Sequence, residues 1–135
     1  MRAAGWERRL DAVIEGARAR PYVLGDNDCF RLACEVVKAL TGVDRWPQFR
    51  GYTTKREALA RIAQYGRSFE AAGDWFFRSS RVPMTQARRG DVAALATSDG
   101  MKHLGIVMGD RVAFMSAEGL IWIRPSDCLC AWRIG

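Results

Sequence analysis

The spacing of apolar residues divides the chain into a helical first part and a strand-rich last part. Up to Gly66, apolar side chains recur every three or four residues, which predicts amphipathic helices over residues 3–19, 29–40 and 54–66. From Gly90 onward the period shortens to two. This predicts an antiparallel meander of five short strands, at residues 91–96, 103–108, 111–116, 120–124 and 129–134.

Capping and turn residues support these boundaries. The polar run at residues 25–28 ends on Asp28 and is suited to cap the second helix, which Gly42 ends. Thr54 and Glu57 have the spacing of a capping box. The pattern therefore predicts an α+β fold, in which N-terminal helices pack on a small antiparallel sheet.

Two stretches have a weaker pattern. Residues 43–53 contain Pro47 and Gly51 and are expected to form a loop. Residues 67–89 allow a short helix around 69–72, which Gly73 is expected to end.

The length and composition indicate one globular domain over residues 1–135. A hydrophobic fraction of 49% is enough for a core and excludes a disordered chain. No apolar run approaches the roughly 20 residues of a membrane span. The first residues lack the apolar segment of a secretory signal, so we expect synthesis and folding in a bacterial cytoplasm, with the four cysteines as free thiols.

The formal net charge is +6, and the basic excess falls before Gly90. Such a charge can attract nucleic acid, an anionic cell-wall polymer or an acidic protein. No nucleic-acid-binding motif accompanies it, so nucleic acid is not the expected partner, and a solvated helical surface explains the charge as well.

Cys29 follows the capping run directly and is expected in the first turn of a helix. Unpaired backbone N–H groups and the helix dipole there favour a thiolate, so we expect a lowered thiol pKa. The same N–H groups could stabilise an oxyanion. The alternative is that Cys29 is a small core residue, because buried free cysteines are common.

His103 is the only histidine in the chain and begins an apolar strand. At a strand end its ring can reach a neighbouring element, although a histidine there can also be a surface residue. The pair Cys128 and Cys130 could in principle join other cysteines around zinc. That spacing fits no common zinc pattern, so we expect neither a metal nor a cofactor.

Three motifs in order resemble the NlpC-type cell-wall peptidases of the papain-like superfamily. That family has a D-C helix, a G-D strand and an H-hydrophobic-G-I strand ending in glycine, matched here by Asp28-Cys29-Phe30, by residues 89–92 and by residues 103–109. The resemblance covers roughly residues 22–134. The closing residues 129–134 also look like the tail of a small branch encoded by phages and prophages.

The resemblance implies a site as well as a fold. Cys29 would be the nucleophile, His103 the general base, and Ser116, on the following strand, the polar group that orients the histidine. Serine departs from the His, Asn or Gln of the family at that position. Asp28 would be a cap or a substrate contact, and Tyr22 would line the site.

The implied function is that of a cysteine peptidase or amidase acting on amides of peptidoglycan stem peptides. The setting would be a phage or prophage tail in the virion, with peptidoglycan and tail proteins as partners. Two alternatives remain open. One is a catalytically inactive tail component that keeps the fold, and the other is a thiol acyltransferase or amidase with another substrate.

Overall fold

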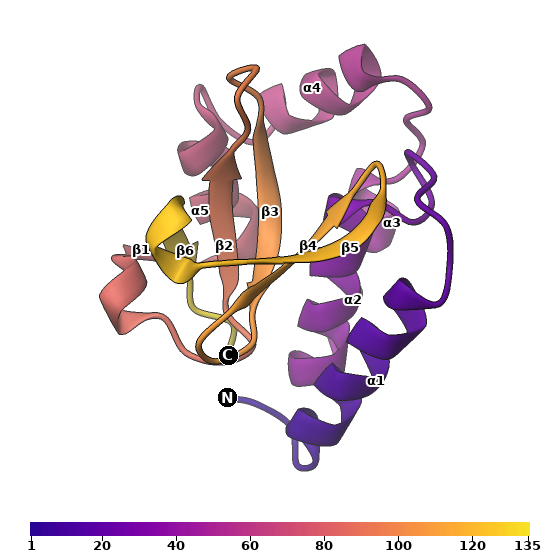
Figure 1. Ribbon diagram of the computed structural model, residues 1–135. Coiled ribbons are helices and arrows are strands. Elements are labelled where there is room, and N and C mark those ends of the chain that lie inside the picture. The colour runs from indigo at the N-terminus through magenta and orange to yellow at the C-terminus, as the bar shows by residue number, and fades with distance from the viewer.

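The computed structural model describes all 135 residues, and its first half is helical (Figure 1). The five helices are α1 (Trp6–Arg18), α2 (Cys29–Thr41), α3 (Trp46–Phe49), α4 (Lys55–Ala63) and α5 (Phe69–Phe77). The three predicted amphipathic helices correspond to α1, α2 and α4. No helix is long and apolar enough to cross a membrane.

The second half forms a six-stranded sheet in which every pair is antiparallel. Its strands are β1 (Arg81–Val82), β2 (Val92–Ala96), β3 (Lys102–Val107), β4 (Val112–Ser116), β5 (Gly119–Ile123) and β6 (Cys128–Trp132). The predicted α+β class is therefore confirmed.

The sheet order is β1-β6-β2-β3-β4-β5, so the predicted simple meander is wrong for its last strand. Strands β2 to β5 do follow one another, but β6 returns across the sheet to pair with β2. Short 3-10 helices before β2 and before β6 complete the chain.

Helix α2 lies against β3 and β4, with α1 packed on its other side (Figure 1). The core between them is apolar, and α2 alone contributes seven buried residues. Both ends of the chain lie close together. Arg2 donates to the Ile134 carbonyl at 2.8 Å and pairs with the fully buried Asp91 at 3.0 Å.

The expected break at Gly73 does not occur, because α5 continues through it to Phe77. The residue is glycine because of packing: a Cβ atom there would lie 2.1 Å from the Trp132 indole. Trp132 is fully buried and its Nε1 donates to Asp74 at 2.8 Å. The loop predicted for residues 43–53 contains the single turn α3.

We predict that Gly73→Ala destabilises the protein by about 1–3 kcal/mol, because the added methyl group must displace the Trp132 ring. Gly16→Ala is the matched control. Gly16 lies inside α1 and a Cβ there meets no atom within 4 Å, so its replacement should stabilise by about 0.5–1 kcal/mol. Urea denaturation of the two variants measures both effects, and equal effects of the two changes would contradict the packing argument.

Candidate active site

The start of α2 is fixed by the carboxylate of Asp28, the residue before Cys29. Its Oδ1 accepts from the Arg31 backbone N–H at 2.8 Å, so Asp28 caps the helix. Its Oδ2 accepts from the Gly25 N–H at 2.7 Å and from the Tyr52 hydroxyl at 2.5 Å. Asp28 is fully buried, and both oxygens are occupied by these donors. Of the two expected roles, the structure supports the cap.

Gly25 allows the loop before α2 to approach the backbone of Tyr52 closely. Its φ is +85°, and a Cβ there would lie 2.2 Å from the backbone oxygen of Tyr52. Only glycine meets both conditions. The loop before α2 is thereby held against Tyr52, and Cys29 occupies the first position of the helix.

Cys29 and His103 line one narrow cavity of about 50 Å³. The cavity lies where the start of α2, the loop before it, one side of α4 and the beginning of β3 meet. Its lining residues are Tyr22, Leu24, Asp28, Cys29, Phe30, Lys55, Ala58, Leu59, Ile62, Met101, Lys102 and His103. Tyr22 thus lines the same cavity as Cys29 and His103.

The thiol of Cys29 differs from the sequence-based expectation. It is 4% exposed, and burial raises its pKa to about 12. The backbone N–H groups of Leu104, Cys29 and Phe30 oppose this rise but do not overcome it. The expected lowered pKa is therefore wrong, because the desolvation cost of a charged sulfur exceeds the stabilisation from the helix start.

His103 is half-buried at the beginning of β3, with its ring centroid 5.3 Å from that of Phe114. Burial lowers its pKa below the ordinary 6.5, while the charge of Asp99 acts in the opposite direction. Burial therefore favours the neutral imidazole, the form that accepts a proton.

Ser116 does not orient His103, contrary to expectation. Its hydroxyl donates to the Gly119 carbonyl at 2.8 Å and accepts from the Glu118 N–H at 3.2 Å, within the β4–β5 turn. Strands β3 and β4 pair only at Ile106–Ala113 and Val107–Val112. Beyond these pairs β4 leaves β3 and runs toward α2 (Figure 1), so Ser116 does not lie opposite His103.

The polar neighbour of His103 is Thr97, which the sequence analysis did not single out. The Thr97 Oγ1 lies 3.3 Å from the His103 Nε2. Thr97 follows β2 in the turn that leads to β3, so its closeness to His103 depends on the pairing of these strands. The sequence did contain a signal for this contact, because Thr97 is a polar residue six positions before His103, across a predicted hairpin.

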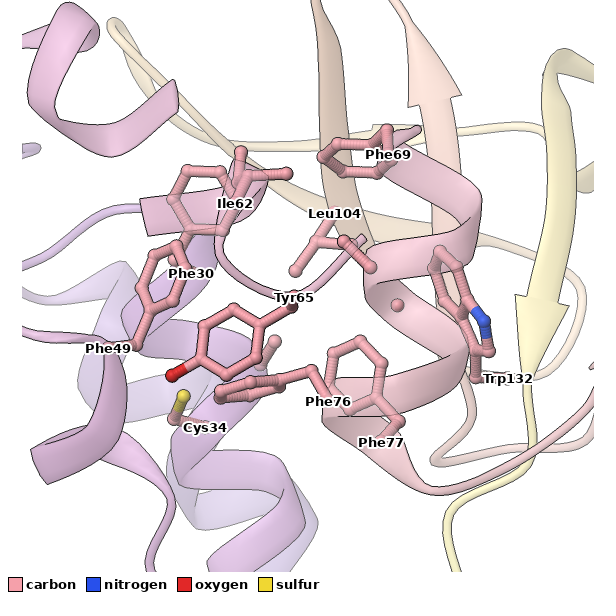
Figure 2. A pocket seen from close by; sticks show the side chains of 13 residues that line it. Phe30, Cys34, Phe49, Ile62, Tyr65, Phe69, Phe76, Phe77, Leu104 and Trp132 are labelled. Carbon is pink, nitrogen blue, oxygen red and sulfur yellow. The ribbon is translucent and has the colours of Figure 1, made fainter. Parts of the chain in front are cut away.

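A second, apolar cavity of about 40 Å³ adjoins the first, with Phe30 and Ile62 lining both. Figure 2 shows its aromatic walls, where the Tyr65 hydroxyl oxygen and the Cys34 sulfur are among the few atoms other than carbon. The Cys34 thiol is buried, and burial raises its pKa to about 12. Cys34 and Cys29 therefore both have a buried sulfur with a raised thiol pKa, but no histidine lines the cavity at Cys34.

The chain belongs to a family described as "Domain of unknown function (DUF6950)", whose model matches residues 1–134. A search of the curated proteins finds no match. Among solved structures the chain is similar to one described as "Crystal structure of NlpC/p60 domain of peptidoglycan hydrolase SagA". The TM-score is 0.59 at 17% identity, over 93% of this chain and 97% of that one. The likeness confirms the predicted NlpC-type fold.

We predict that iodoacetamide near neutral pH labels Cys128 and Cys130 before Cys29 and Cys34. Burial raises the thiol pKa of all four cysteines, but Cys128 and Cys130 are partly exposed to the reagent, whereas Cys29 and Cys34 are buried. Mass mapping of a time course measures the order, and labelling in denaturant should make all four equal. Fast labelling of Cys29 in the folded protein would contradict the neutral buried thiol.

Proposed function

We propose that this member of the DUF6950 family is a cysteine hydrolase that cleaves amide bonds of peptidoglycan stem peptides. The observation that carries the proposal is the shared cavity of Cys29 and His103, with Cys29 at the N-terminus of α2. The similarity to the NlpC/p60 domain of a protein described as a peptidoglycan hydrolase supports the choice of substrate.

The reaction starts from a neutral thiol and a neutral imidazole. As the Cys29 sulfur attacks the amide carbon, the thiol proton passes to a ring nitrogen of His103. Backbone N–H groups at the start of α2 stabilise the oxyanion. His103 then returns the proton to the leaving amine as the C–N bond breaks, which leaves a thioester. A water molecule attacks the thioester, the acid leaves, and the proton returns to sulfur.

The charge around the site suits an anionic wall polymer. Lys55 and Lys102 line the cavity, while the one acidic lining residue, Asp28, is buried beneath it. Lys102 is paired with Glu70 at 2.5 Å, which leaves Lys55 without an ion-pair partner. Carboxylates of a stem peptide are the groups that such a cation attracts.

We further propose that the protein acts as part of a phage or prophage tail in the virion. The proposal rests on the likeness of residues 129–134 to the tail of the phage-encoded NlpC-like branch. Under this proposal the protein is made in the bacterial cytoplasm, and the assembled virion carries it to the wall. Its partners would then be tail proteins and peptidoglycan.

The second candidate is a catalytically inactive tail component. The 4% exposure of Cys29 and the small volume of its cavity favour it, because a substrate needs room that the cavity does not offer without movement of its walls. Substrate-dependent opening of the α4 side of the cavity distinguishes an enzyme from such a component.

We predict that Cys29→Ala lowers amine release from purified peptidoglycan by at least about 10³-fold, because the sulfur that forms the thioester is lost. His103→Ala should lose most of the rate as well. Cys34→Ala is the matched control, since it removes a buried sulfur from the same helix and should keep most of the activity. The acid limb of the wild-type rate should lie below pH 6.5, because the His103 pKa is lowered.

A wild type that releases no amine from any wall tested would overturn the hydrolase proposal. Equal losses in Cys29→Ala and Cys34→Ala would show a packing effect and not chemistry. Virions that assemble and infect normally with Cys29→Ala, combined with an inactive wild type, would favour the structural tail component.

A further inference from the structure

The turn between β2 and β3 holds a short chain of polar groups that ends on His103. The Thr97 Oγ1 lies 3.3 Å from the His103 Nε2 and also hydrogen-bonds to the Asp99 carboxylate. Backbone bonds fix this turn: the Thr97 N–H donates to the Met101 carbonyl at 2.9 Å, and the Met101 N–H donates to Asp99 Oδ1 at 3.0 Å. The five-residue turn 97–101, which directly precedes β3, therefore holds Thr97 and Asp99 beside His103.

The direction of these hydrogen bonds follows from the donors available. The Thr97 hydroxyl has one proton, and two of its partners, the Asp99 carboxylate and the Met101 carbonyl at 3.2 Å, can only accept. The proton therefore points away from His103, and a lone pair of Oγ1 faces the ring. His103 must then carry its proton on Nε2, which leaves Nδ1 unprotonated and free to act as the base.

We propose that Thr97 and Asp99 are positioning residues that hold His103 with Nε2 protonated and Nδ1 available to the Cys29 thiol. This inference rests on the proposed hydrolase function. The group that orients His103 is then Thr97, in the turn before β3, and not Ser116, on the strand after it.

Charges from several elements face the imidazole. Asp99 on the turn favours the imidazolium, whereas burial and Lys55 on α4 disfavour it. On α2, the neutral Cys29 thiol lines the same cavity. Asp99 is exposed, so solvent and salt weaken its charge effect. Its main contribution is the acceptor that turns the Thr97 hydroxyl, and that is a matter of geometry.

The single histidine makes the test direct, because one imidazole gives one set of ring ¹⁵N signals. Two-bond ¹H–¹⁵N spectra of the folded wild type above the His103 pKa should show the Nε2–H tautomer. Thr97→Val removes the acceptor at nearly constant shape and should give a mixture of tautomers. Thr97→Ser keeps the hydroxyl and should restore the wild-type spectrum. Ser116→Ala, the matched control, should leave the spectrum unchanged.

Kinetics give the second readout. Thr97→Val should lower kcat about tenfold to a hundredfold with KM unchanged, because the ring is misplaced and not the substrate. Thr97→Ser should recover most of this loss. Asp99→Asn keeps an acceptor oxygen but removes the charge that raises the His103 pKa, so the acid limb of kcat should move to lower pH.

A wild-type Nδ1–H tautomer, or a Thr97→Val spectrum identical to that of the wild type, would overturn the assignment. The spectra need no turnover. A wild type with the Nε2–H tautomer but no hydrolysis would support the positioning role and overturn the proposed reaction. An active enzyme with the Nδ1–H tautomer would support the reaction and overturn the positioning role.

Discussion

The candidate site depends on one buried carboxylate. Asp28 is fully buried, yet its oxygens receive N–H groups from the preceding loop and from α2, and a hydroxyl from Tyr52. A buried charge without such donors would cost several kcal/mol, so the loop, the helix start and Tyr52 must assemble together. Because Cys29 is the next residue, this assembly sets where its sulfur lies. Asp28 thereby positions the proposed nucleophile.

The same assembly has a chemical cost. Placing Cys29 at the base of a narrow cavity buries its sulfur, and the pKa of the thiol rises to about 12 despite three nearby backbone N–H groups. His103 lines the same cavity, and burial lowers its pKa and so favours the neutral ring. In the proposed reaction the pair therefore starts neutral, and the thiol proton moves to the imidazole as the sulfur attacks. This protects the thiol from unspecific reaction and makes the position of the imidazole decisive.

Capping motifs and hydrophobic periodicity correctly predicted the elements that depend on interactions between residues close in sequence. The Asp28 cap, the Thr54–Glu57 capping box and the change of period at Gly90 located α2, α4 and the sheet, and the resemblance placed Cys29 and His103 at one site. The errors that affect the site concern contacts distant in sequence. Position 73 is a glycine inside α5 because Trp132, 59 residues later, fills the space beside the helix. Ser116 does not reach His103 because β4 pairs with β3 at only two positions. Burial of Cys29 likewise depends on α4 and β3, which no pattern around the cysteine reveals.

Under the proposed function, Cys29 alone forms a covalent bond to substrate. An activated ester of a stem-peptide acid should acylate the enzyme faster than water releases it, so acid quenching and intact-mass spectrometry can trap the product. We expect one adduct with the mass of the acyl group, mapped to the peptide that contains Cys29, removed by hydroxylamine and absent from Cys29→Ala. No adduct, or an adduct on Cys34, Cys128 or Cys130 instead, would contradict the proposed chemistry.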